Sequence, residues 1–359
     1  MKFLNTVIIG TGSYTPKKII KNEEFLNQDF FSEDHKIIQE PGEEIIEKFQ
    51  AITGIEERRY ADDNMNTSDL AGFAAEKAIK DSGIDPETLD YIILAHNFGD
   101  VHKGNIQSDL LPNMASRVKH FLQIKNPDCI AYDILFGCPG WIQAFLQAHS
   151  YINSGMAKRI LVIGAETLSR VNDKYDRDSM IFADGAGAAV IEAQESDKKK
   201  GLLSFSVRTD TYKEAFYLYV GKSTNPYINQ DVRYIKMFGR KIYEYSLINV
   251  PLAMKLSLDR SGYDIKDLKK IIIHQANEKM DDAMVHRFYK LYGMHKEIPE
   301  DIMPMSINKL GNSSVATIPT LYDDILKNIY PRHQIKEGDL IMFASVGSGM
   351  NINSIVYKL

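Results

Sequence analysis

An internal repeat constrains this chain more than any other feature of its sequence. Shifting the sequence by 179 residues aligns residues 82–85 with 261–264 without gaps. In each copy, a glycine suited to the left-handed end of a helix is followed by a short acidic turn. A continuous apolar run then follows, at 91–94 in one copy and at 271–273 in the other. Such runs are typical of strands that are covered on both faces.

The same shift places the apolar run 161–163 on 340–342, so two separate segments share one offset. Two βα units can resemble each other by chance, but a constant offset close to half of the 359 residues argues against chance. We therefore expect an α/β protein with two pseudo-symmetric halves of βαβαβ type, residues 1–195 and 196–359. No linker rich in proline, glycine or serine separates them, so we expect the halves to pack tightly.

Composition excludes several classes of protein. The net charge of −5 and the sequence pI of about 6.0 give no indication of a nucleic-acid partner. No apolar stretch approaches the roughly 20 residues needed to cross a bilayer, and the first residues lack a signal-peptide cleavage pattern. Two cysteines imply neither a disulfide framework nor a zinc cluster, and the histidines lack the spacing of metal ligands. We expect a soluble, cytoplasmic protein without a metal, in which each cysteine either packs or reacts.

Helical spacing of apolar residues predicts helices over 69–81 and 140–154, each ending before a glycine. Residues 22–50 are charged, with scattered aromatics, and are expected to form a helical excursion on the surface. Glycines at 184–190 enter a predicted strand, where they permit close approach of another backbone.

Cys138 stands between a strand-like run and a proline, in the segment 133–141 (Asp-Ile-Leu-Phe-Gly-Cys-Pro-Gly-Trp). Pro139 is the residue type favoured at the first position of a helix, which places Cys138 at a helix N-terminus. The macrodipole there favours a thiolate, so we expect a nucleophile. The competing interpretation is a small core residue, the usual role of a lone cysteine, and Cys129 is assigned that role.

Two further polar residues occupy positions that suit a site. His274 directly follows the predicted strand 271–273, at the end where open α/β sheets bind ligands. Asn312 lies at the tight entry to a helix of small residues. Taken alone, these residues are explained as a core histidine and an N-cap asparagine. The repeat, however, starts equivalent helices near Cys138 and Asn312, so the three residues form one constellation.

Gly-rich loops after strands complete the sequence signals. The segment 344–350 follows the predicted strand 340–343, and a backbone N–H there can meet a developing oxyanion. Gly10-Thr11-Gly12 also follows a strand, but Thr15 occupies the place of the third glycine of a dinucleotide fingerprint. We therefore predict no NAD site.

Taken together, these segments resemble the β-ketoacyl-acyl carrier protein synthases III of the thiolase superfamily. The resemblance runs from the first strand at 7–10 to the last at 353–356. It includes Thr-Gly-Ile-Glu-Glu-Arg at 53–58, the cysteine segment, His-Gln-Ala-Asn at 274–277 and Gly-Asn-Ser-Ser at 311–314. It implies a thiolase-like fold, in which the two halves form a five-layered αβαβα arrangement, and a homodimer.

The resemblance also implies a reaction, the decarboxylative Claisen condensation of fatty acid biosynthesis. Cys138 would be acylated by a thioester, with the backbone N–H groups of Cys138 and Ser348 as the oxyanion hole. A malonyl-type thioester on an acyl carrier protein would then lose CO₂, while His274 and Asn312 donate hydrogen bonds to the enolate. The substrates would be coenzyme A or phosphopantetheine thioesters, and no further cofactor is expected.

The sequence departs from the family where the acyl donor binds. Lys48 and Ile52 replace the tryptophan and arginine that clamp the adenine of coenzyme A in the family. Arg177 matches a family arginine at the nucleotide end, and Lys279 replaces another. Arg177 and Lys279 are therefore expected to contact the carrier or coenzyme A, and both kinds of donor stay open.

The loop from 96 to 111 is longer than usual in the family and carries Asp109. In the family this loop reaches the partner subunit's acyl pocket, and Leu111 holds the place of the pocket-shaping phenylalanine. These departures fit a specialised relative that joins two longer acyl chains, as in dialkylresorcinol or long-chain ketone synthesis, with Asp109 as a candidate base. Two more functions stay open at this point: a non-catalytic partner subunit, and an acyltransferase that forms no carbon–carbon bond.

Overall fold

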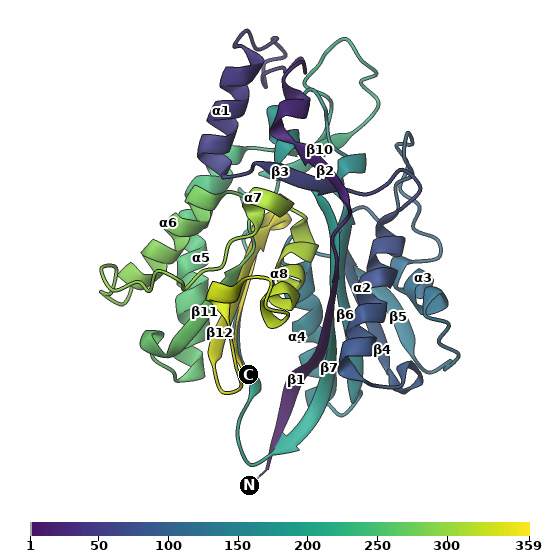
Figure 1. Cartoon of the computed structure of the whole chain (residues 1–359), viewed down its shortest axis with the longest axis vertical. Helices are drawn as coiled ribbons and strands as arrows, with labels where there is room; N and C mark the ends of the chain where they lie inside the picture. Colours follow the sequence, from purple (N-terminus) through teal and green to yellow (C-terminus); the bar gives the residue numbers. More distant parts are fainter. Residues whose placement is uncertain (1) are drawn as a thin grey trace.

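Two sheets organise the protein, and the computed structural model describes residues 2–359 of it (Figure 1). The first sheet contains, in spatial order, β1 (Phe3–Tyr14), β7 (Asp184–Ser196), β6 (Arg159–Thr167), β4 (Tyr91–His96) and β5 (Ile130–Leu135). The second contains β11 (Leu268–Ile273), β12 (Leu340–Gly347), β13 (Asn351–Lys358) and β8 (Gly201–Thr209). Pairing is parallel between β4 and its neighbours β5 and β6 and between β11 and β12, and antiparallel elsewhere in these sheets.

Helices form three layers around these two sheets (Figure 1). The outer face of the first sheet is covered by α2 (Thr67–Ser82) and α3 (Met114–Phe121). The outer face of the second is covered by α5 (Gly239–Ser261) and α6 (Glu278–Lys290). Between the sheets lie α4 (Gly140–Asn153) and α8 (Thr317–Leu326). The five-layered, thiolase-like αβαβα arrangement predicted from the sequence is confirmed.

The repeat is visible in the order of the elements. The helix α2 ends at Gly83 and α5 ends at Gly262, both in the left-handed conformation with φ of 70° and 77°. A short 3₁₀ turn and then a buried strand, β4 or β11, follow each glycine. The expected division of the chain at residue 195 falls at the end of β7, before β8 begins the second sheet.

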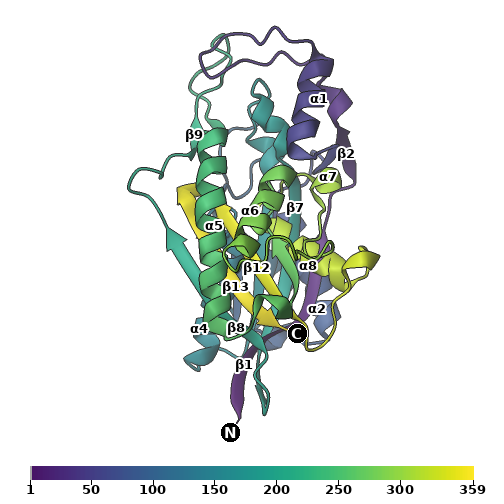
Figure 2. The same ribbon diagram turned by 90° about the vertical axis from the view of Figure 1, so that its left-hand side faces the viewer.

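The smaller elements lie at one end of the molecule, where α1 (Gly42–Thr53) stands (Figure 2). They are two ribbons, β2 (Lys18–Lys21) with β3 (Glu57–Tyr60) and β9 (Leu218–Gly221) with β10 (Tyr234–Met237), and the short helix α7 (Ile307–Leu310). The helical surface excursion predicted for 22–50 is only partly present. Apart from α1, it contains a single 3₁₀ turn at Asn22–Phe25, and Phe30 and Phe31 are buried. No helix within 2–359 has the length and apolar character needed to cross a membrane.

The central layer is held by apolar packing on all sides of α4. Trp141 and Phe145 of this helix are buried against both sheets, as expected for a helix that is apolar around most of its surface. The ring of Phe343 in β12 lies 5.8 Å from Trp141 and 5.1 Å from Tyr322 of α8. The two halves therefore share one core, which fixes the central helices relative to both sheets.

The glycine segment that enters β7 allows α8 to approach the first sheet. A β-carbon on Gly187 would lie 2.7 Å from the β-carbon of Pro319 and 2.7 Å from the backbone nitrogen of Thr320. On Gly185, by contrast, it would meet only ordinary contacts, the nearest being the side chain of Ser313 at 3.5 Å. The close approach predicted from the sequence is thus confined to one of these two glycines.

We predict that Gly187→Ala lowers the free energy of unfolding by about 1–3 kcal/mol, because overpacking against α8 must displace the helix backbone. The matched variant Gly185→Ala should change it by less than about 0.5 kcal/mol. Urea denaturation of both variants measures the difference. Equal stability of the two variants would contradict the close approach of α8 to β7.

Candidate active site

Cys138 lies in the turn that joins β5 to α4 at the junction of the two halves. The helix α4 begins at Gly140, as predicted, and Pro139 is its N-cap residue rather than its first helical residue. The nearest polar partner of the sulfur is the hydroxyl of Ser314, whose Oγ lies 3.4 Å from Sγ. Ser314 belongs to the other half of the chain, so the repeat brings a polar group to the cysteine.

His274 and Asn312 are both fixed by backbone hydrogen bonds. The N–H of His274 donates to the carbonyl of Ala344 at 2.8 Å, which holds His274 beside β12 at the end of β11. The N–H of Asn312 donates to the carbonyl of Ile181 at 2.9 Å, and its own carbonyl accepts from the N–H of Ala183 at 2.8 Å. Both side chains are buried. These anchors leave little freedom to either side chain.

Ser314 connects the three predicted residues. Its backbone N–H donates to Oδ1 of Asn312 at 2.8 Å, and its hydroxyl donates to Sγ of Cys138. Its backbone also interacts with the imidazole of His274. Ser314 adopts a φ of 53°, in the left-handed region that few non-glycine residues occupy. The structure therefore gathers Cys138, His274 and Asn312 around one strained residue that the sequence analysis did not single out.

The predicted oxyanion-hole residues also lie together. A β-carbon on Gly137 would lie 2.9 Å from the backbone nitrogen of Ser348, and one on Gly347 would lie 2.5 Å from that of Cys138. The segment after β12 thus packs directly on the cysteine turn. This contact places the backbone N–H groups of Cys138 and Ser348 in neighbouring positions, as oxyanion donors require.

Burial, rather than the helix terminus, controls the charge of the thiol. It raises the pKa of Cys138 to about 11, and the nearby carboxylate of Glu166 acts in the same direction. The thiolate predicted from the helix N-terminus is therefore wrong for the resting protein, because desolvation outweighs the dipole. The Ser314 hydrogen bond offsets only part of the shift.

The imidazole of His274 is neutral for the same reason. Burial lowers the pKa of His274 to about 4, and a hydrogen bond to the backbone of Ser314 opposes this shift only in part. Its Nδ1 is buried and has no hydrogen-bond partner among residues 2–359. At neutral pH the site thus holds a thiol, a neutral imidazole and an amide, with no preformed ion pair among these three groups.

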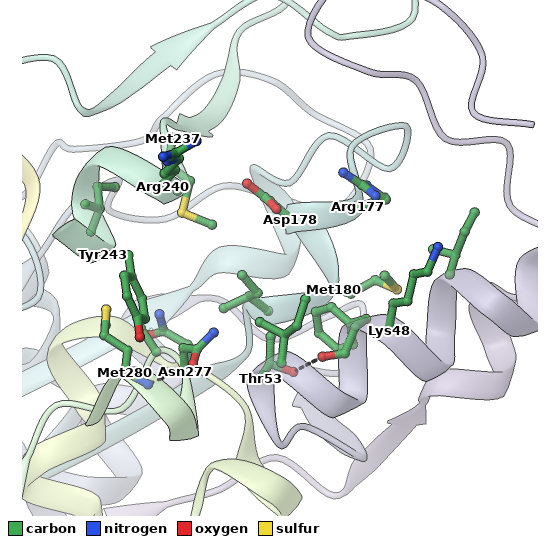
Figure 3. Close-up of a pocket in the computed structure, with 18 residues that line it drawn as sticks. Lys48, Thr53, Arg177, Asp178, Met180, Met237, Arg240, Tyr243, Asn277 and Met280 are labelled. Carbon is green, nitrogen blue, oxygen red and sulfur yellow. Dashed lines mark hydrogen bonds between the residues drawn. The ribbon is translucent and has the colours of Figure 1, made fainter. Parts of the chain in front are cut away.

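A cavity of about 370 Å³ leads from the surface to Asn312 (Figure 3). Lys48 and Arg177 lie on one side of this cavity, while Tyr243 and Asn277 lie on the other. Apolar side chains form much of its wall, among them Ile45, Phe49, Ile52, Met180, Ile181, Met237, Ile242 and Met280. Its shape and lining suit an extended chain with an apolar arm and an anionic end.

The two residues expected to contact the carrier or coenzyme A differ in position. Arg177 lines the cavity and is exposed to solvent. Lys279 is exposed on α6 and does not line the cavity, although its neighbour Met280 does. Lys48, at the position of the family's tryptophan, pairs with Glu44 at 2.6 Å on the surface of α1.

The distal part of the long loop after β4, which carries Asp109 and Leu111, is held by Arg117. Asp109 accepts a hydrogen bond from Arg117 at 2.6 Å, and Arg117 also binds the buried Asp100 at 2.8 Å. The Arg117 guanidinium lowers the pKa of Asp109, which weakens it as a base. None of the hydrogen bonds of Asp109 reaches the three central residues. Leu111 is 87% exposed.

Two polar residues that the sequence analysis missed lie behind Ser314. The amide Nδ2 of Asn97 contacts Ser314 Oγ at 3.1 Å and donates to Oε1 of Glu166. Glu166 is buried, and burial raises its pKa to about 8. Asn97 follows β4 and Glu166 lies near the end of β6, so both are polar residues at the carboxyl ends of strands. The same signal that identified His274 would have found them.

Comparisons with known proteins agree with this geometry. The two profiles of the 3-oxoacyl-[acyl-carrier-protein (ACP)] synthase III family, N-terminal and C-terminal, match residues 132–211 and 258–359. The β-ketoacyl-[acyl-carrier-protein] synthase III of Erythrobacter litoralis is 33% identical over 349 residues, 96% of this chain and 97% of the relative. The crystal structure of 3-oxoacyl-[acyl-carrier-protein] synthase III from Aquifex aeolicus superposes with a TM-score of 0.78 at 30% identity. It covers 99% of this chain and 100% of its own.

More distant structures share the fold. A crystal structure of Xanthomonas campestris OleA superposes with a TM-score of 0.76, at 19% identity over 100% of this chain and 98% of its own. A sequence identity of 19% supports a shared fold but no shared function. The synthesis of long-chain products, for which Asp109 was the candidate base, is therefore not favoured by these comparisons.

We predict that alkylation of Cys138 by iodoacetamide accelerates with rising pH across the neutral range. Since burial raises the pKa of the thiol to about 11, the thiolate fraction at pH 7 is small and grows about tenfold per pH unit. Peptide mass spectrometry separates Cys138 from the buried Cys129, and Cys138→Ala is the control. A rate that levels off below pH 7 would instead show a preformed thiolate–imidazolium pair.

Proposed function

Because the chain belongs to the 3-oxoacyl-[acyl-carrier-protein (ACP)] synthase III family, we propose that it joins an acyl thioester to a malonyl-type thioester by decarboxylative Claisen condensation. The observation that carries the proposal is the convergence of a thiol, a neutral imidazole and an amide on Ser314. This set of groups provides one nucleophile and two hydrogen-bond donors in a buried site.

In the first half-reaction, Sγ of Cys138 attacks the carbonyl carbon of the acyl thioester. A new carbon–sulfur bond forms, the bond to the carrier sulfur breaks, and the thiol proton ends on the departing thiol. Since the resting thiol is neutral, this proton must leave as the bond forms. The neutral His274 is able to accept it. The backbone N–H groups of Cys138 and Ser348 stabilise the oxyanion of the intermediate.

In the second half-reaction, the malonyl thioester loses CO₂ and becomes an enolate. His274 and Asn312 donate hydrogen bonds to the enolate oxygen. The Oδ1 of Asn312 accepts from the backbone of Ser314, which leaves its Nδ2 as the atom of this amide that can donate to the enolate. The enolate carbon attacks the acyl carbonyl and a carbon–carbon bond forms. The acyl–sulfur bond then breaks, and Cys138 leaves as a thiolate that takes up a proton. Neutral donors suit this step, since a carboxylate beside the enolate would repel it.

The substrate arm enters through the cavity that ends at Asn312. Arg177 and Lys48 are cations near its opening, suited to the phosphate of a phosphopantetheine or coenzyme A thioester. Ile52, which is 54% exposed, offers no aromatic surface on which an adenine can stack. We therefore favour an acyl carrier protein as partner in both half-reactions, with Lys279 beside the opening as a further contact. No cofactor beyond the thioesters is required.

A cytoplasmic location suits this proposal. The chain has two cysteines, both free, and free thiols persist in reducing compartments. A nucleophilic cysteine stays reduced, and therefore active, in such a compartment.

We predict that Cys138→Ala forms no acyl adduct with any donor, whereas His274→Ala still becomes acylated, more slowly, but releases no CO₂ from a malonyl donor. The reason is that the sulfur is required for the adduct and the imidazole for the enolate. Intact-protein mass spectrometry with a panel of acyl-coenzyme A and acyl-carrier donors measures the first step. Release of labelled CO₂ measures the second.

The same panel separates the condensing enzyme from two different functions. Wild-type protein without an adduct from any donor would indicate a non-catalytic partner subunit. An adduct that forms without CO₂ release from the malonyl donor would indicate an acyltransferase. Equal loss of both steps in His274→Ala would contradict the division of roles between the thiol and the imidazole.

We also propose a homodimer that forms through the edges of both sheets. The strands β5 and β8 are edge strands, and a hollow between them is lined by residues from both, including Leu135, Phe205 and Val207. Leu135 is 65% exposed and Val207 is 50% exposed. Unpaired edges with apolar side chains associate readily. Leu111 lies nearby, because Asn113 bonds to Ala131 of β5, and its exposure suits insertion into a partner.

We predict that Leu135→Asp and Val207→Asp shift the protein from dimer to monomer in analytical ultracentrifugation, because each places a charge in the apolar face. Ile329→Asp is the matched control, since Ile329 is 61% exposed but lies in the turn after α8. Fully active wild-type monomer in the same experiment would contradict the dimer.

A further inference from the structure

A chain of hydrogen bonds leads away from the sulfur of Cys138 into the first half of the protein. Ser314 Oγ lies 3.4 Å from Sγ, and Asn97 Nδ2 lies 3.1 Å from Ser314 Oγ. The same Nδ2 donates to Oε1 of Glu166. Asn97 directly follows β4 and Glu166 lies near the end of β6, and these two strands are parallel neighbours in the first sheet. The condensation mechanism described above uses neither residue.

The chemistry of these groups determines which atom donates and which accepts in each of these hydrogen bonds. The amide nitrogen of Asn97 donates to Oε1 of Glu166, and this oxygen can accept whether the carboxyl group is ionised or carries its proton on Oε2. That nitrogen carries two hydrogens, and the second points to the oxygen of Ser314. A hydroxyl has a single proton. Its oxygen already accepts from Asn97, and within residues 2–359 the sulfur of Cys138 is the acceptor that the structure gives for its proton.

We propose that Glu166, acting through Asn97, is a positioning residue that fixes the Ser314 hydroxyl as a hydrogen-bond donor to the sulfur of Cys138. This inference rests on the proposed function, in which Cys138 is the nucleophile. A hydrogen bond to an ionised group is stronger than one to a neutral group, so the donated proton favours the thiolate over the thiol. These hydrogen bonds thereby reduce the free-energy cost of ionising the buried sulfur.

The burial of Glu166 indicates a specific role. Only 1% of its surface is exposed, and its Oε2 is buried without a hydrogen-bond partner among the described residues. A buried carboxyl group with an unpaired oxygen is costly to folding, whether or not it is ionised. Beyond burial, the nearby carboxyl group of Asp184 raises the pKa of Glu166. Glu166 in turn raises the pKa of the Cys138 thiol. When Glu166 is ionised, its charge raises the pKa of the thiol, whereas the hydrogen bonds that it orients through Asn97 lower that pKa.

Two variants test whether the Ser314 hydroxyl donates its proton to the sulfur of Cys138. Ser314→Ala removes the donor, and Asn97→Asp replaces the amide by an isosteric acceptor, which turns the Ser314 proton away from Cys138. The pH dependence of Cys138 alkylation by iodoacetamide is the readout. Both variants should move its midpoint upward by about one pH unit and slow alkylation at pH 8 about tenfold. Ser345→Ala is the matched control, since that hydroxyl is buried without a partner on β12.

A second pair of variants isolates the role of Glu166. Glu166→Gln and Glu166→Ala both remove the charge, but only glutamine keeps an oxygen acceptor for Asn97. Loss of the charge alone lowers the midpoint of the pH dependence of Cys138 alkylation. Glu166→Gln should therefore be alkylated at least as fast as the wild type. Glu166→Ala should react about fivefold more slowly than Glu166→Gln. Melting temperatures of all variants show whether each is folded.

The proposal is overturned if Asn97→Asp alkylates like the wild type or if Glu166→Ala reacts as fast as Glu166→Gln. A uniform slowing in the Ser345→Ala control would also overturn it, because the effect would then be general to the core. Alkylation needs no thioester substrate. Wild-type protein that alkylates as predicted but forms no acyl adduct would therefore refute the proposed function and leave this inference intact.

Discussion

The structure depends on the packing of one half of the chain against the other at the cysteine turn. Gly347 and Ser348, from the end of the second sheet, lie directly on Gly137 and Cys138 from the first. Ser314, also from the second half, donates a hydrogen bond to the sulfur. Neither half contains a complete site. The common core around α4 and α8 holds both contributions in one geometry, so the precision of the chemistry derives from the packing of the central layer.

Burial has a second consequence, which is electrostatic. A shared core removes water from the sulfur and the imidazole, and each therefore favours its neutral form. For the proposed reaction this is useful in the second step, where neutral donors stabilise a developing enolate. It is costly in the first step, where the sulfur must lose a proton. Local hydrogen bonds from Ser314 and the two backbone N–H groups compensate where charge develops.

The sequence predicted the fold well, because the repeat encodes it. The αL glycines at 83 and 262 and the buried runs after them identified two equivalent units, and the layers followed from these. It also predicted Cys138, His274 and Asn312, since residues at strand ends and helix starts converge in such a fold. These are features of local pattern and topology.

What the sequence did not predict depends on three-dimensional neighbours. The thiolate was wrong because the degree of burial at the helix terminus cannot be obtained from residue order. Asn97 and Glu166 carry the same strand-end signal as His274, but only the contact of Asn97 with Ser314 of the other half shows that they adjoin the site. Asp109 was assigned as a candidate base before its pairing with Arg117 was known. The exposed position of Leu111 gains meaning only beside the edge strand β5.

The central claim is that one buried site carries out both halves of the condensation on the same sulfur. A single-turnover experiment tests it most directly: enzyme acylated on Cys138 is mixed with one equivalent of malonyl-acyl carrier protein, and the enzyme mass and the CO₂ released are followed together. The account predicts that the acyl adduct disappears as an equal amount of CO₂ and 3-oxoacyl product forms. Release of CO₂ while the adduct persists, or loss of the adduct only as free acid, would contradict it.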